Sequence, residues 1–141
     1  MKDYSDTAVV LPCYNEAISI EKVIRDFRKC LPGASIHVFD NDSSDETALI
    51  ARQAGATVHT VKQKGKGNVV SRMFADIGAS ILLMADGDGT YPAAGAPALI
   101  EAIRKGADMA VGVRRATADA CYRGGTPIWS QVAIRPCKCR I

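Results

Sequence analysis

The chain has 141 residues and a mass of 15.0 kDa, which suffices for one compact domain and not for two ordinary ones. Its 48% of hydrophobic and 23% of charged residues are typical of a soluble globular protein and exclude a disordered or fibrous one. A net charge of +3 gives no argument for nucleic acid as a partner. The longest apolar run, residues 79–85 with Ser80 interrupting it, is far shorter than the ~20 residues that cross a bilayer.

The N-terminus has no apolar stretch after a basic start, so a secretory signal is not expected. The number of cysteines is odd and they are widely scattered, which disfavours an extracellular disulfide framework. We therefore expect a cytoplasmic protein with reduced thiols. The cysteines are Cys13, Cys30, Cys121, Cys137 and Cys139.

Apolar runs of strand length alternate with segments whose apolar residues recur at helical spacing. This alternation predicts an α/β fold with an open, mostly parallel sheet and helices on both faces. Residues 116–141 show no sustained period, and we assign them no element. In chain order, the expected elements are strand 7–11, helix 20–31, strand 35–39, a helix ending near 54, strand 56–61, helix 69–77, strand 81–85, helix 97–105 and strand 109–113.

Two details refine the expected boundaries. Pro12 follows the first run and predicts the end of that strand. Ser43 and Glu46 stand three residues apart, as in a capping box, which predicts the start of the second helix.

Polar or acidic loops follow three of the expected strands, at residues 12–16, 40–45 and 86–88. In an open parallel sheet, ligands bind outside the carboxyl ends of the strands, so these loops are expected to converge. Crowded carboxylates repel one another unless a cation neutralises them, and Mg²⁺ or Mn²⁺ prefers such oxygen ligands and bridges to phosphates. The Asp-Gly-Asp sequence at 86–88 therefore predicts a metal–diphosphate site.

Each of these loops also has a purely conformational explanation. Turns collect Asp and Gly, and the 40–45 cluster could be a loop with a helix cap. The basic, glycine-rich stretch 62–68 could be a solvated turn or could bring charge near a phosphate. It lacks the spacing of a P-loop, so that type of phosphate cradle is rejected.

The same residues resemble a known family. VLPCYNE at 10–16, DNDSSDET at 40–47 and DGDGTY at 86–91 are similar, in order and spacing, to the signatures of family-2 glycosyltransferases. The subgroup most similar is that of the dolichyl- or polyprenyl-phosphate mannose and glucose synthases. The resemblance runs from about residue 8 to 115. It implies a GT-A fold and an inverting transfer of one hexose from a nucleotide-diphosphate sugar.

The resemblance also implies roles at the nucleotide. Pro12, Tyr14 and Glu16 would line the nucleotide pocket, while Asp40 and Asp42 would contact the base or ribose. Asn41, between them, stands where many relatives have Asp.

Further implied roles concern the metal and the diphosphate. Asp86 would lie on the ribose and metal side, and Asp88 would bind Mg²⁺ or Mn²⁺ with Thr90 beside it. Arg114 would approach the diphosphate and, with Asp88, stabilise the leaving group. Lys66, like Lys64, falls in a loop that the family keeps basic.

The resemblance divides the chain into a nucleotide-sugar-binding domain, 1–115, and an unassigned tail, 116–141. The acceptor implied is a polyprenyl phosphate at the cytosolic face of the membrane. From Thr126 onward the tail departs from the family, and we hypothesise a reading-frame change there. Two alternatives stay open: a catalytically inactive fragment that binds only nucleotide and metal, and a nucleotidyltransferase on a similar sheet, which fits the acidic loops but not the 12–16 signature.

Overall fold

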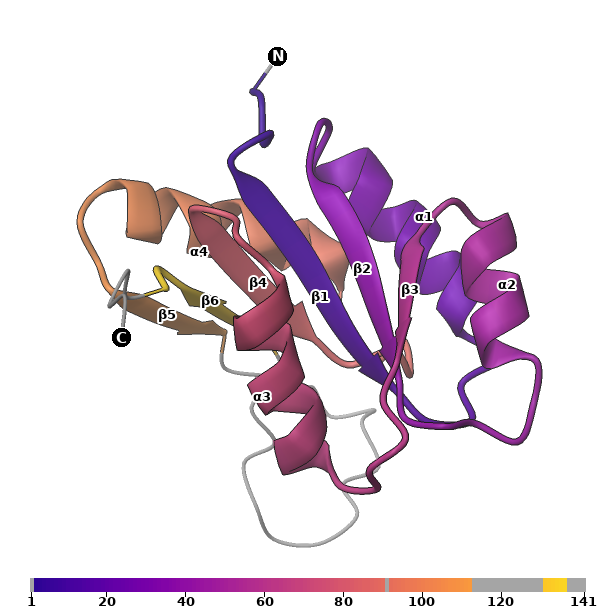
Figure 1. The fold of residues 1–141 in the computed structure, drawn as a ribbon. Helices are drawn as coiled ribbons and strands as arrows, with labels where there is room; N and C mark the ends of the chain where they lie inside the picture. The colour runs from indigo at the N-terminus through magenta and orange to yellow at the C-terminus, as the bar shows by residue number, and fades with distance from the viewer. Residues whose placement is uncertain (1, 91, 113–130, 137–141) are drawn as a thin grey trace, which may run out of the picture.

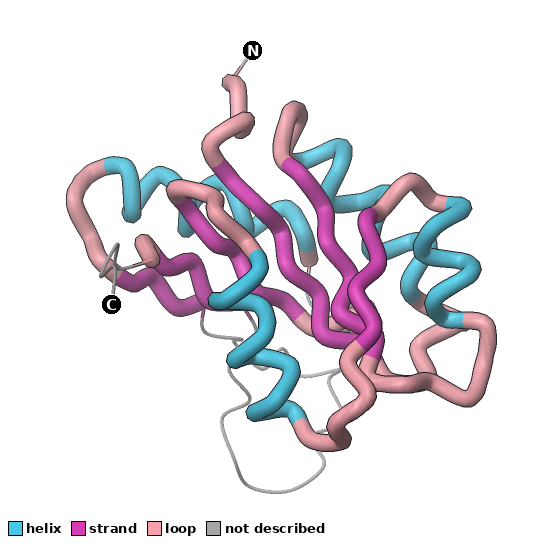
Figure 2. Tube along the Cα trace, viewed as in Figure 1, coloured by secondary structure: helices cyan, strands magenta, loops and turns pink. Residues whose placement is uncertain are grey.

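The computed structural model describes residues 2–90, 92–112 and 131–136. They form a six-stranded sheet in the order β3-β2-β1-β4-β6-β5, flanked by helices (Figures 1 and 2). The strands are β1 Thr7–Cys13, β2 Ser35–Asp40, β3 Thr57–Thr60, β4 Ile81–Ala85, β5 Met109–Gly112 and β6 Gln131–Ile134. The helices are α1 Ile20–Cys30, α2 Thr47–Gln53, α3 Lys66–Asp76 and α4 Ala96–Arg104, with a 3₁₀ turn, η1, at Ala93–Gly95.

The predicted α/β class and the mostly parallel sheet are confirmed. β1 pairs in parallel with β2 on one side and with β4 on the other, and β3 extends the parallel sheet beyond β2. β6 lies between β4 and β5 and runs antiparallel to both. The segment 131–134, to which the sequence pattern assigned no element, therefore separates β4 from β5 in the sheet.

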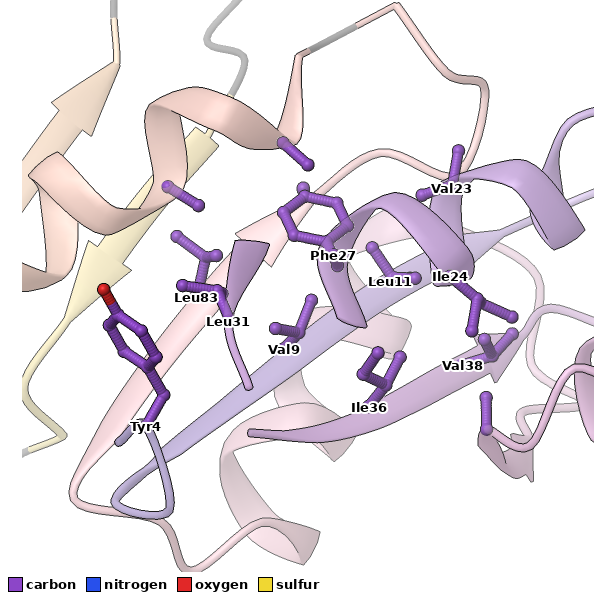
Figure 3. Packing of buried hydrophobic residues seen from close by; sticks show 14 of the residues in the cluster. Tyr4, Val9, Leu11, Val23, Ile24, Phe27, Leu31, Ile36, Val38 and Leu83 are labelled. Atoms are coloured by element: carbon purple, nitrogen blue, oxygen red, sulfur yellow. The ribbon is translucent and has the colours of Figure 1, made fainter. Parts of the chain in front are cut away.

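Both faces of the sheet are buried, which explains why the central strands lack a polar alternation. Val9 and Leu11 of β1 face a core shared with α1, α2 and α4 (Figure 3). Val10, between them, faces the opposite way and packs in a second cluster with Val69 and Met73 of α3. The predicted helices on both faces are thus present, with α3 toward the viewer in Figure 1.

Three predicted boundaries move by two residues or more. β1 continues through Pro12 to Cys13, because pairing with β2 extends beyond the last residue paired with β4. α3 begins at Lys66, so part of the expected basic loop is helical. The predicted capping box is wrong: the Ser43 hydroxyl donates to Asp40, and α2 begins at Thr47, whose N–H donates to Asp45 at 3.0 Å.

Candidate functional site

A cavity of about 540 Å³ lies at the carboxyl ends of β1, β2 and β4. The loops that leave these strands meet there because the three strands are neighbours in the sheet, as the sequence predicted. α3 begins beside them and closes one side of the cavity. The lining residues are Pro12, Cys13, Tyr14, Glu16, Asn41, Lys64, Gly65, Lys66, Val69, Asp86 and Asp88.

Side chains join the loop after β1 to the loop after β2. Asn15 adopts a left-handed conformation, with φ of 52°, and its Oδ1 accepts the N–H of Ser44 at 2.9 Å. The Asn15 N–H donates to the Ser43 hydroxyl at 2.9 Å. The Glu16 N–H donates to Oγ1 of the buried Thr47, also at 2.9 Å. These contacts fix the segment that carries Tyr14 and Glu16.

The two acidic residues expected at the base or ribose lie outside the cavity lining. Asp40 is buried and accepts hydrogen bonds from the backbone and side chain of Ser43. Asp42 is exposed, with φ of 57°, and its backbone carbonyl accepts a hydrogen bond from the Lys64 ammonium at 3.4 Å. Asn41, between them, does line the cavity. The roles of Asp40 and Asp42 stay predictions.

Three carboxylates share the cavity, those of Glu16, Asp86 and Asp88. Partial burial raises the pKa of Glu16, and the negative charges of Asp88 and Asp86 raise it further. Asp88 Oδ1 accepts hydrogen bonds from the N–H and the hydroxyl of Thr90 at 3.0 and 2.7 Å, and the role of Thr90 at a metal stays a prediction. The structure thus gathers three of the acidic groups that the sequence expected at this edge, while Asp40 and Asp42 lie outside the cavity lining.

The Asp86–Asp88 loop lies directly against β1 and α1. The Ser19 hydroxyl donates to the Gly87 carbonyl at 2.7 Å. A Cβ on Gly87 would collide with Cys13 Sγ, so only glycine permits this approach. Cys13 is buried, and burial together with the surrounding carboxylates raises the pKa of its thiol, so this thiol stays protonated and is a poor nucleophile.

Basic side chains face the acidic ones across the cavity. The Lys66 ammonium lies 3.0 Å from Asp86 Oδ1, and the Lys64 ammonium lies 4.5 Å from the centre of the Tyr14 ring. Asn41 fixes the segment that carries them: its amide donates to the carbonyls of Val61 and Gln63, and its Oδ1 accepts the N–H of Gly65. The sequence predicted the basic loop but not what holds it in place.

The carboxylates present fit a hard divalent ion that also takes ligands from a substrate. Their oxygens are the donors that Mg²⁺ and Mn²⁺ prefer, and the mutual repulsion at Glu16 is relieved by added positive charge. Among residues 2–90, 92–112 and 131–136, however, no three His, Cys, Asp or Glu side chains lie close enough to hold an ion by themselves. Asp86 and Asp88 would hold it jointly with diphosphate oxygens.

Several predicted features lie outside the described residues. Arg114, expected at the diphosphate, is one of them, as are Tyr91 and most of the tail. In the part of the chain that the structure describes, no helix has the length and apolarity needed to cross a bilayer.

The side chains that sequence reasoning missed are Asn15, Thr47 and Cys13. Asn15 and Thr47 act through hydrogen bonds to residues about thirty positions away, so no local pattern reveals them. For Asn15, a short polar side chain shortly after a strand is the one available signal.

The fold is a doubly wound α/β sheet, and a cavity with acidic and basic side chains lies at the carboxyl ends of its strands. This combination defines the class of nucleotide-binding sheet proteins to which GT-A transferases belong. The family described as Glycosyl transferase family 2 matches residues 8–136. The chain belongs to this family. Membership favours a glycosyltransferase over the nucleotidyltransferase alternative.

Two relatives differ in how much of their length this chain spans. Protein RfbJ of Shigella flexneri is 56% identical over 120 residues, which are 84% of this chain and 93% of RfbJ. Dolichol-phosphate mannosyltransferase of Pyrococcus furiosus is 32% identical over 114 residues, 76% of this chain and 32% of that enzyme. This chain thus spans nearly all of the first relative and about a third of the second.

A solved structure with the same fold is glucosyl-3-phosphoglycerate synthase of Mycobacterium tuberculosis, in complex with Mn²⁺, UDP and glucosyl-3-phosphoglycerate. It aligns with a TM-score of 0.63 and 27% identity, over 69% of this chain and 39% of that one. The predicted GT-A type of fold is therefore confirmed.

Proposed function

We propose that this chain forms the nucleotide-sugar-binding part of an inverting, metal-dependent hexosyltransferase. Its donor would be a nucleotide-diphosphate sugar of the GDP-mannose or UDP-glucose type. One observation carries the proposal: Glu16, Asp86 and Asp88 share a single cavity with Lys64 and Lys66. A cavity with both signs of charge suits a diphosphate that arrives together with a divalent cation.

The expected reaction separates charge at the diphosphate. When the bond between sugar and nucleotide breaks, the diphosphate gains negative charge, and a divalent ion held by Asp86 and Asp88 would stabilise it as a Lewis acid. Lys66, already 3.0 Å from Asp86, can add a further positive charge at the same place. Arg114 would contribute a bidentate contact to the diphosphate.

The nucleotide would occupy the side of the cavity formed by Pro12, Tyr14 and Asn41. Tyr14 is half exposed, so part of its ring is available to a base, and the Lys64 ammonium lies over the same ring. Asp40 would support the base or ribose indirectly, through its hydrogen bond with Ser43. Asp42 would contact the base or ribose from the edge of the cavity. The name of the Mycobacterium synthase complex, which pairs Mn²⁺ with UDP, supports a metal–nucleotide site on this fold.

A polyprenyl phosphate is the proposed acceptor. The names of relatives support it, among them the Pyrococcus dolichol-phosphate mannosyltransferase and a polyprenol monophosphomannose synthase of Mycolicibacterium smegmatis. The phosphate oxygen of such an acceptor is already anionic, so no strong general base is needed for attack from the face opposite the nucleotide. A hydroxyl acceptor would need a carboxylate base. Contact with the cytosolic face of a membrane follows from the acceptor's lipid chain.

A transfer assay tests the function directly. The purified chain is incubated with Mn²⁺, radiolabelled GDP-mannose or UDP-glucose and a short polyprenyl phosphate, and labelled lipid is extracted. Transfer with inversion at the anomeric carbon supports the proposal.

A second candidate function has the same support, because a cavity with carboxylates and lysines is also what nucleotide and metal binding alone requires. On this alternative, residues 1–115 form a nucleotide-sugar-binding domain that lacks turnover. Metal-dependent nucleotide binding without any labelled lipid would support it. The absence of both binding and transfer would contradict both candidates.

A further inference from the structure

The Asn41 side chain is held by three hydrogen bonds within one short segment. Its Nδ2 donates to the carbonyls of Val61 and Gln63, each at 2.8 Å. Its Oδ1 accepts the N–H of Gly65 at 3.1 Å. Asn41 itself is only 9% exposed, although it lines the cavity.

The segment that Asn41 holds carries both lysines of the cavity. Gly65 has φ of 122°, a conformation that side chains rarely adopt, and it stands between Lys64 and Lys66. Asn68 braces the segment from the helix side, because its Nδ2 donates to the Lys64 carbonyl at 3.0 Å. The Lys64 ammonium then reaches the Tyr14 ring and the Lys66 ammonium reaches Asp86. A displacement of this segment would move both positive charges.

The chemistry of the amide explains why asparagine suits this position. Two of its three partners are carbonyls, which need donors, and the third is an N–H, which needs an acceptor. An aspartate of the same shape offers acceptors alone and would face two carbonyl oxygens without a hydrogen between them. Both amide hydrogens of Asn41 are already used, so Asn41 has none left to donate to a base.

We propose that Asn41 is a positioning residue, which holds Lys64 and Lys66 at the diphosphate, rather than a residue that reads the base. This inference rests on the proposed function, since it concerns how the same cavity binds a nucleoside diphosphate. Asn41 touches no diphosphate oxygen in this scheme and acts through the two lysines.

Comparing diphosphates with nucleosides separates the two roles. Binding of GDP, UDP, guanosine and uridine to the full chain is measured in Mn²⁺ for the wild type and Asn41→Ala. If Asn41 positions the lysines, the affinity for the diphosphate that the wild type prefers falls about tenfold, while the affinity for its nucleoside changes by less than about twofold. An equal loss for diphosphate and nucleoside would overturn the positioning role, because base reading acts on both.

A double-mutant cycle tests whether Asn41 acts through the lysines. In a Lys64→Met/Lys66→Met background, Asn41→Ala should cause no further loss of diphosphate affinity. A further loss as large as in the wild-type background would contradict the inference. Gln53→Ala, at the exposed end of α2, is the matched amide control and should leave all four affinities unchanged.

A second variant covers the case in which Asn41→Ala does not fold. Gly65→Ala leaves Asn41 in place and displaces the same segment, since alanine is strained at φ of 122°. It should lower the diphosphate affinity and spare the nucleoside, and loss of both equally would count against positioning. If the wild type binds neither GDP nor UDP, the proposed function itself fails, which distinguishes that failure from failure of the role of Asn41.

Discussion

At the scale of single residues, the contact between Gly87 and Cys13 determines how closely the Asp86–Asp88 loop approaches β1. No side chain could stand at position 87 without meeting the Cys13 sulfur. This close approach places the carboxylates on either side of Gly87, those of Asp86 and Asp88, in the same cavity as Glu16. A packing contact thus underlies the electrostatic character of the cavity.

Gly87→Ala should lower the free energy of unfolding by about 1–3 kcal/mol, because the new methyl group overpacks a closed contact. Urea denaturation measures this change. In a Cys13→Ala background the sulfur is absent, so the added cost of Gly87→Ala should largely disappear. Strictly additive costs of the two substitutions would show that the contact does not limit the loop.

At the scale of elements, the loops after β1 and β2 depend on Thr47, the first residue of α2. Its buried hydroxyl accepts the Glu16 N–H and donates to Asp45. A helix terminus thus holds the backbone of a neighbouring loop that lines the cavity.

Thr47→Val keeps the shape of the side chain and removes the hydroxyl, leaving the Glu16 N–H without its partner. We expect a loss of about 1–3 kcal/mol in the free energy of unfolding. Hydrogen exchange at the Glu16 amide should accelerate by more than the global loss explains. Thr57→Val, on the exposed side of β3, is the control and should be nearly neutral. Unchanged exchange at Glu16 in Thr47→Val would contradict the role of this hydrogen bond.

Strands β2 and β3 are joined by a pair of histidines. His37 Nδ1 lies 3.1 Å from His59 Nε2, and the His59 ring stacks on Phe39 with centroids 4.5 Å apart. Burial lowers the pKa of His37, and the neighbouring His59 lowers it further. The folded state therefore favours neutral His37.

This depressed pKa predicts how stability depends on pH. Below the ordinary histidine pKa of about 6.5, the unfolded chain binds a proton that folded His37 resists, so the free energy of unfolding falls as the pH falls. Chemical denaturation between pH 8 and 5.5 should show this decline, and His37→Asn should reduce its slope. An identical slope in the variant would mean that His37 does not contribute.

At the scale of the whole molecule, the sequence predicted the parts of the fold that depend on local periodicity. The runs at 7–11 and 81–85 are apolar on both faces, and their helical neighbours have clear spacing, so the parallel core and its ligand edge followed from the pattern. The location of the acidic loops followed in turn, because β2, β1 and β4 are adjacent.

What the sequence could not predict depends on contacts distant along the chain. β6 has four residues and gains its partners, Leu82 to Ala85 and Met109 to Gly112, only in the assembled sheet. Ser43 has the spacing of a helix cap, yet its hydroxyl donates a hydrogen bond to Asp40. A local motif does not reveal which hydrogen-bond partner this hydroxyl takes in the folded chain. The position of the two lysines likewise rests on Asn41, more than twenty residues earlier.

The central claim is that carboxylates at one edge of the sheet bind a divalent ion together with a nucleotide diphosphate. Calorimetric titration of the full chain with GDP-mannose and UDP-glucose, each with and without Mn²⁺, tests it most directly. At least one of the two should bind about tenfold tighter with Mn²⁺. Asp88→Asn should abolish this gain and leave the fold intact, while Asp76→Asn, on α3 beside Arg72, should retain it. Equal affinity with and without Mn²⁺, or an Asp88→Asn protein that binds like the wild type, would contradict the account.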